Sequence, residues 1–213
     1  MMQLPEDSAY RAMLALAASP PNATGRLHLS AALRRLGAIV AASDASDQEF
    51  EEIASLVDRV TDGIEFGVEA SRYPLSERLA GSAGLFVNHP VIGPLNPCAP
   101  PLAVVPDGPL LIGTATYGTP FEGPPGCVHG GHIAAGFDSI VVMTAGINGL
   151  AGFTRSLSIR YRRPAPLGVS LVYQGQVEST KDRSTIVRVV LRHNDLVCAE
   201  CTGDVATGTP SRQ

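Results

Sequence analysis

The stretch that decides the fold is EGPPGCVHGGHIAAGFD, residues 122–138. Pro124, Pro125 and Gly126 cannot extend a helix, so they predict a rigid turn. After this turn, apolar residues recur at helical spacing, at positions 133, 137, 140, 141 and 143. Gly130 and Gly131 therefore open a helix, where free N–H groups and the positive end of the dipole suit a developing oxyanion. Asp138, farther along this helix, suits a general base or a nucleophile.

The pattern around this stretch predicts an α+β domain over residues 110–213. It indicates a strand at 110–117, a helix at 130–148, and strands near 153–163, 169–180, 184–193 and 196–206. The predicted helix is apolar nearly all round, so other elements must cover it. One long helix among consecutive antiparallel strands favours a sheet wrapped around a central helix.

Two further regions precede this domain. Residues 1–66 predict an N-terminal helical extension of amphipathic helices, with a capping box at Ser46–Glu49. Each of these helices is expected to need an apolar partner surface. Residues 67–109 are rich in proline, which breaks regular elements, and we interpret them as a connecting segment that packs over the surface or the pocket.

Composition and charge exclude several classes of protein. The 213 residues carry a formal net charge of −4, which argues against a nucleic-acid binder. No uncharged run has the length of a membrane span, and the start lacks the basic region of a signal peptide. We therefore expect a cytoplasmic protein with reduced thiols that binds neither nucleic acid nor a membrane.

Cys198 and Cys201 have the C-x-x-C spacing of metal and redox sites. Their segment is predicted to be a strand, in which residues three apart point to opposite faces. A zinc site would also need a second pair of ligands, and none is suitably spaced. Two small apolar strand residues are the favoured interpretation, and no metal or cofactor is expected.

His129-Gly130-Gly131, followed by Asp138 nine residues after the histidine, resembles the hotdog-fold acyl-CoA thioesterases of the thioesterase superfamily, PaaI-like branch. Residues 152–168 resemble the second strand of that family, and the resemblance spans roughly residues 96–206. It implies a hotdog fold and hydrolysis of an acyl-CoA thioester. It also implies that Asp138 activates water or attacks directly, Gly130 N–H holds the thioester oxygen, His129 helps to position it, and Thr154 supports the acid.

Other interpretations of these residues stay open. Asp138 could be a helix aspartate that bonds to a neighbour, although its apolar neighbours indicate partial burial, which would raise its pKa. Strand alternation places Thr154 on the face opposite Leu157 and Ile159, away from the helix, unless a bulge changes the alternation. His132 replaces the small or apolar residue usual in the family and is left out of the predicted site.

The predicted substrate-binding residues are Gly131, Arg160 and Arg162. Gly131 belongs to the glycine pair at the helix start. Arginine pairs well with phosphate, and coenzyme A carries three phosphate groups. A solvated strand face is an equally good interpretation of the arginines.

The spacing of the site residues predicts a homo-oligomer, either a dimer or a dimer of dimers. Gly130 and Asp138 lie eight residues apart on one helix, about 12 Å at 1.5 Å per residue. One thioester carbonyl cannot reach both within a single chain, so two chains must share each site. Two rival functions remain, a hotdog hydratase or dehydratase and a non-catalytic acyl-CoA or acyl-carrier binding protein.

Overall fold

The computed structural model describes residues 9–18, 23–63, 86–100 and 102–207. Three helices come first, α1 (Ala9–Ala18), α2 (Thr24–Ala42) and α3 (Asp47–Asp62). The remaining elements are β1 (Leu102–Asp107), β2 (Leu110–Ala115), the short 3-10 helix η2 (Thr119–Phe121), α6 (Gly130–Ile147), β3 (Gly152–Tyr161), β4 (Leu171–Lys181), β5 (Ser184–His193) and β6 (Leu196–Thr207).

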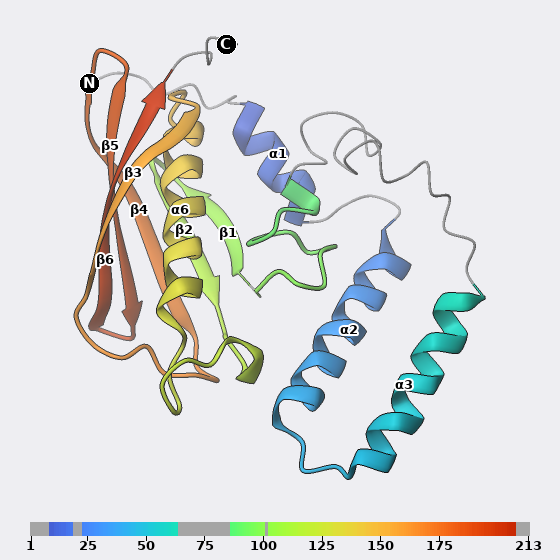
Figure 1. Cartoon of the computed structure of the whole chain (residues 1–213). Helices are drawn as coiled ribbons and strands as arrows, with labels where there is room; N and C mark the ends of the chain where they lie inside the picture. Colours follow the sequence, from blue (N-terminus) through green and yellow to red (C-terminus); the bar gives the residue numbers. More distant parts are fainter. Residues whose placement is uncertain (1–8, 19–22, 64–85, 101, 208–213) are drawn as a thin grey trace.

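The six strands form one antiparallel sheet in the order β1-β2-β4-β5-β6-β3, and α6 lies against its concave face (Figure 1). The predicted α+β arrangement, an antiparallel sheet wrapped around a central helix, is therefore confirmed. The helix bounds and those of the last four strands agree with the prediction to within a few residues.

The prediction that prolines exclude regular structure before residue 110 is wrong at β1. This strand contains Pro106 and pairs with β2 over its whole length. Proline cannot donate to a neighbouring strand, but β1 is at the edge of the sheet, with β2 as its one neighbour. The sheet therefore begins at Leu102 and not at residue 110.

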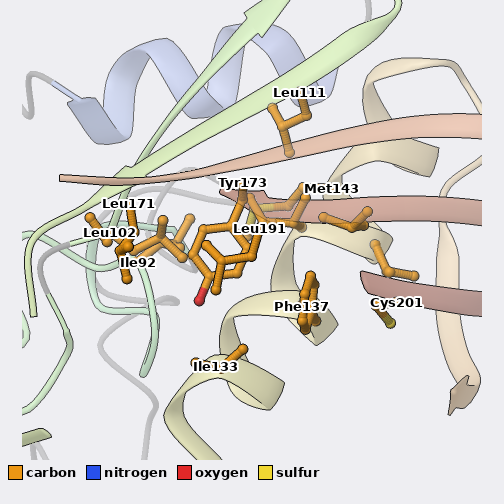
Figure 2. Packing of buried hydrophobic residues seen from close by; sticks show 14 of the residues in the cluster. Ile92, Leu102, Leu111, Ile133, Phe137, Met143, Leu171, Tyr173, Leu191 and Cys201 are labelled. Carbon is orange, nitrogen blue, oxygen red and sulfur yellow. The ribbon is translucent and has the colours of Figure 1, made fainter. Parts of the chain in front are cut away.

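Glycines in the sheet let α6 approach it closely. A methyl group added at Gly175 of β4 would collide with the hydroxyl of Thr144, and one at Gly203 of β6 would lie 2.5 Å from Val141. Phe137 of α6 is fully buried and packs edge-to-face on Tyr173, with ring centroids 5.4 Å apart (Figure 2). By length and composition α6 could cross a membrane, but most of it is buried here, as in the core helix of a globular domain.

Residues 86–100 pack onto the same core. Ile92 and Leu95 are buried, and Figure 2 shows Ile92 in one cluster with Leu102 and Leu171. Helix α2 is tied to this segment, since Ser30 donates to the carbonyl of Leu95 over 2.8 Å. We refer to residues 86–100 below as the covering segment.

The predicted capping box at the start of α3 is confirmed. The amide of Glu49 donates to the Ser46 hydroxyl, and the Ser46 amide donates to the Glu49 carboxylate over 2.8 Å. No residue of α3 is buried, however, and Leu56 and Val60 are more than half exposed. The expected apolar partner of this helix is not found in the part of the chain that the structure describes.

Candidate active site

The start of α6 presents a backbone amide that is free to bind an oxygen. His129 caps the helix, and its Nδ1 accepts from the Gly131 N–H over 3.0 Å. The Gly130 N–H has no intrahelical acceptor, as is usual in a first turn. Nor does any described residue outside the helix accept from it. The predicted oxyanion donor is therefore available at this position.

A rigid turn holds this helix start in place. Gly126 has a φ of 72°, which favours glycine, and its amide donates to the Glu122 carboxylate over 2.6 Å. The His129 amide donates to the carbonyl of Phe121 over 2.8 Å, so η2 fixes the capping residue. On the other side, the Tyr161 hydroxyl donates to the carbonyl of Gly130 over 2.8 Å.

Asp138 and Thr154 are in direct contact. The Thr154 hydroxyl donates to Oδ1 of Asp138 over 2.6 Å. Strand alternation predicted the opposite orientation, but the pairing of β3 with β6 shifts between Thr154 and Ser156. This bulge adds one residue to β3, so that Thr154 shares the helix-facing side with Leu157. The contact is the one that the resemblance implies, while the catalytic role of Thr154 stays a prediction.

Asp138 is exposed in the single chain, so its predicted partial burial is wrong. Its neighbours Phe137 and Ile140 are buried because they face the sheet, whereas Asp138 lies on another side of the helix. Gly130 and Asp138 are both in α6, at opposite ends of a stretch about 12 Å long. A site that uses both groups needs a second chain, and this sharing stays a prediction.

His89, in the covering segment, is a group near the site that sequence reasoning missed. Burial lowers the pKa of His89, while the negative charge of Asp138 raises it. The covering segment therefore comes within electrostatic range of Asp138. Nδ1 of His89 accepts from the amide of Val91 over 3.2 Å, which fixes the ring. Nothing in the local sequence indicates this, because the proximity depends on how the segment packs.

His132, excluded from the predicted site, lies beside the capping histidine. Its ring meets Phe121 edge-to-face, with centroids 5.0 Å apart, and is 6.0 Å from the ring of His129. Burial, and secondarily the electrostatic influence of His129, lower the pKa of His132. A neutral His132 against an aromatic ring is compatible with an apolar surrounding.

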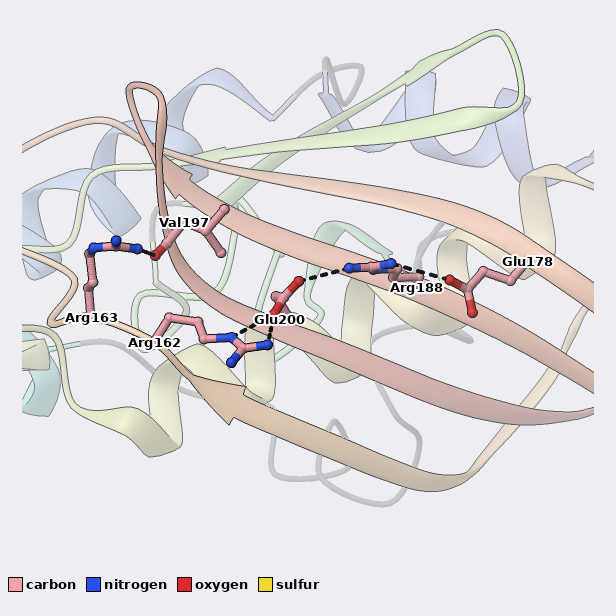
Figure 3. A network of polar contacts seen from close by, with 6 residues as sticks. All are labelled: Arg162, Arg163, Glu178, Arg188, Val197 and Glu200. Atoms are coloured by element: carbon pink, nitrogen blue, oxygen red, sulfur yellow. Dashed lines mark hydrogen bonds and ion pairs between the residues drawn. The ribbon is translucent and has the colours of Figure 1, made fainter.

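Arg160 and Arg162 are not brought together with Asp138 of the same chain. They extend from β3 into a polar hollow, on the side of the sheet away from α6. Arg162 forms an ion pair with Glu200 at 2.7 Å, and Glu200 also binds Arg188 at 2.8 Å (Figure 3). The pKa of Glu200 is lowered by these hydrogen bonds, from Arg162 first and from Arg188 second. Binding of coenzyme A by these arginines stays a prediction.

Comparison with known proteins identifies the same part of the chain. Residues 125–199 match the family model described as "Thioesterase superfamily". This segment includes His129, Gly130, Asp138 and Thr154.

Curated relatives match over a similar length. Acyl-coenzyme A thioesterase THEM4 of Xenopus laevis is 37% identical over 76 residues, which are 35% of this chain and 33% of the relative. Acyl-coenzyme A thioesterase THEM5 of Homo sapiens is 32% identical over 78 residues, 37% of this chain and 32% of the relative. The matches span about a third of the length of these relatives.

A solved structure resembles more of the chain. It is the crystal structure of a thioesterase superfamily protein, with a TM-score of 0.69 and 28% sequence identity. The match covers 88% of this chain and 93% of that one, so it reaches well beyond the segment that the family model matches.

Proposed function

We propose that this chain, whose residues 125–199 match the thioesterase-superfamily model, is a hotdog-fold enzyme that hydrolyses acyl-CoA thioesters. The main support for the proposal is the hydrogen bond from Thr154 to the carboxylate of Asp138. Asp138 lies on α6, the helix that begins with the free amide of Gly130. The names of the curated relatives, both acyl-coenzyme A thioesterases, support the same chemistry.

Each group has a separate task in this mechanism. Asp138 activates a water molecule or attacks the thioester carbon, and the bond from Thr154 fixes the orientation of its carboxylate. The N–H of Gly130 stabilises the oxyanion, a contribution of about 2.7–4 kcal/mol for such donors. Nδ1 of His129 accepts a hydrogen bond from the Gly131 amide, so a neutral His129 carries its hydrogen on Nε2. The Nε2–H group can then donate a hydrogen bond to the thioester oxygen. Collapse of the oxyanion breaks the C–S bond, so that coenzyme A leaves as a thiol with the proton taken from water and the acyl group leaves as the acid. After direct attack, water hydrolyses the acyl–Asp138 anhydride.

We propose further that each site is formed by two chains. The separation of about 12 Å along α6 requires it, because both groups must contact one carbonyl. Strand β3 is at the edge of the sheet and carries the exposed side chains of Phe153 and Tyr161, which gives a second copy a surface to meet. A two-fold axis would then place the Gly130 amide of one copy opposite Asp138 of the other. The cytoplasmic location stays a prediction.

The test combines two inactive variants. Asp138→Asn removes the base, and Gly130→Pro removes the amide donor at a helix position where proline is tolerated. His129 already has the extended backbone that a following proline requires, with φ −61° and ψ 132°. Each variant alone should release free thiol at least about 100-fold more slowly than wild type. A mixed dimer has one intact site of two, and random mixing makes about half of the dimers mixed, so the mixture should recover up to about a quarter of wild-type activity.

The matched control is Gly130→Ala, which keeps the amide. Its added methyl group would lie at an ordinary contact distance of 3.4 Å from Tyr161, so activity should stay near that of wild type. Full activity of Asp138→Asn would exclude the role of Asp138, and folded mixed dimers without recovery would exclude the shared site. Measuring free thiol also separates hydrolysis from hydration and from binding without turnover.

A further inference from the structure

A cavity of about 820 Å³ lies between helix α2 and the start of α6. One wall is formed by α2, with Leu33, Gly37 and Ala38, and the other by η2 and His132. Pro97 and Cys98 of the covering segment close it on a third side. The volume is within the range of sites that bind small organic molecules.

The cavity begins close to the predicted oxyanion donor. His132, which lines it, is two residues beyond Gly130 in the first turns of α6. Phe121, which also lines it, packs on His132 and accepts a hydrogen bond from the His129 amide. A group bound in the cavity would therefore be continuous with a thioester held at the start of α6.

The lining suits an apolar group. Among the residues that the structure describes, the lining contains no carboxylate, and most of its side chains are apolar. Of its two arginines, Arg34 is already engaged, since it donates to the carbonyls of Asn96 and Pro94 over 2.9 and 3.4 Å. Burial lowers the pKa of His132 and so disfavours a charge on that ring. A hydrocarbon chain or an aryl group fits this surface better than the phosphates of coenzyme A.

We propose that this cavity holds the apolar end of the acyl group, and that α2 thereby determines which acyl groups are accepted. The inference rests on the proposed thioesterase function. It assigns substrate selection to a helix outside the segment that matches the family model. Acyl-CoAs whose acyl chain is long enough to reach α2 are then hydrolysed with a higher kcat/KM than acetyl-CoA.

The first experiment narrows the cavity from the α2 side. Gly37 lines the cavity, and no atom lies within 4 Å of a Cβ added there, so the backbone position tolerates a side chain and Gly37→Phe adds a ring at the cavity wall. The matched control is Gly25→Phe, on the same helix, with equal free space and no place in the cavity lining. Gly37→Phe should lower kcat/KM for decanoyl-CoA at least ten-fold and leave that for acetyl-CoA unchanged. Each buried methylene is worth about a four-fold change.

The second experiment needs no turnover. Cys98 is exposed and lines the cavity, whereas Cys127 is half-buried and Cys198 and Cys201 are buried, so a maleimide reagent should label Cys98 most readily, and the mass of the Cys98 peptide reports it. Decanoic acid should slow this labelling, followed by mass spectrometry, in wild type and in Gly25→Phe. It should not slow labelling in Gly37→Phe.

The outcomes separate the two proposals. Absence of thiol release from every acyl-CoA tested would refute the thioesterase function, and the labelling result would then decide the cavity alone. Where hydrolysis occurs, identical acyl-chain profiles of Gly37→Phe and Gly25→Phe would overturn the role of α2. Where no hydrolysis occurs, the proposed role of the cavity would be overturned if decanoic acid left the rate of maleimide labelling at Cys98 unchanged.

Discussion

Helices α6 and α3 have similar lengths, 18 and 16 residues, but opposite surroundings. Most of α6 is buried by the sheet, whereas no residue of α3 is buried. The structure of α6 is therefore determined by tertiary packing, and that of α3 by local bonds such as its capping box. The same change should have a global effect in one region and a local effect in the other.

The largest expected difference comes from adding one methyl group to a glycine in two regions, the sheet against which α6 packs (Gly175 of β4) and the N-terminal helices (Gly37 of α2). At Gly175 the methyl group would collide with Thr144 and lie 2.9 Å from Ile140, so Gly175→Ala should lower the free energy of unfolding by about 1–3 kcal/mol. At Gly37 it would meet no atom, and Gly37→Ala should stabilise α2 by about 0.5–1 kcal/mol. Chemical denaturation measures both. Equal effects of the two changes would remove the contrast between the regions.

The next effect concerns the site. Thr154→Val keeps the shape of the side chain and removes the bond to Asp138. A hydrogen bond to a charged group contributes about 1.5–3 kcal/mol, so kcat for an acyl-CoA should fall at least about ten-fold. KM should change little if the bond only orients the carboxylate. Thr154→Ser should recover most of the rate, and an unchanged kcat in Thr154→Val would show that Asp138 needs no support.

A smaller effect is expected from alkaline pH. Burial, and secondarily the charge of Asp138, raise the pKa of Cys201 from 9.0 to about 11. The folded state therefore holds a proton that the unfolded chain releases, so this stabilisation is complete below pH 9 and is lost as the pH rises toward 11. Burial also raises the pKa of Tyr173 well above 10.0, so the loss of folding stability continues at higher pH.

The measurement is the free energy of unfolding between pH 9 and 11. Cys201→Ala should show a shallower decline than wild type over this range. The exposed Cys98 provides the control, since Cys98→Ala should keep the wild-type slope. If the free energy of unfolding of Cys201→Ala declines as steeply as that of wild type, the titration of Cys201 does not contribute to the loss of stability.

The smallest effect should be confined to α3. Ser46→Ala removes the cap and should destabilise the helix by about 0.5–2 kcal/mol. Since no residue of α3 is buried, amide exchange within α3 should accelerate while the global unfolding midpoint stays unchanged. Ser55→Ala, at an exposed position of the same helix, should not accelerate exchange. A lower global midpoint in Ser46→Ala would show that α3 is coupled to the rest of the protein.

The sequence predicted the elements whose pattern reflects their own burial. Helix α6 and strands β3–β6 were located because their apolar spacing follows directly from a helix enclosed by a sheet. Strand β1 was missed because Pro106 argues against a strand, and only the order of the sheet shows that β1 is at an edge. The order of strands is not contained in local periodicity.

The candidate site shows the same division. His129, Gly130 and Asp138 form a motif within one helix and its cap, so their placement on α6 followed from spacing. The orientation of Thr154 depended on a one-residue bulge, which alternation cannot reveal. The proximity of His89 to Asp138 arises from packing between segments that are distant in the chain. The same is true of the cavity wall that α2 forms.

The position of α6 in the chain also has a consequence for synthesis. Strand β2 precedes this helix, but the other strands that cover it, β3 to β6, follow it and end at Thr207. At about 5–20 residues per second, α6 leaves the ribosome several seconds before its covering sheet is complete. During that interval a helix apolar enough to cross a membrane is without most of its sheet. We therefore expect truncation after β3 to yield a nascent chain that chaperones retain, although it already carries the whole helix and Thr154.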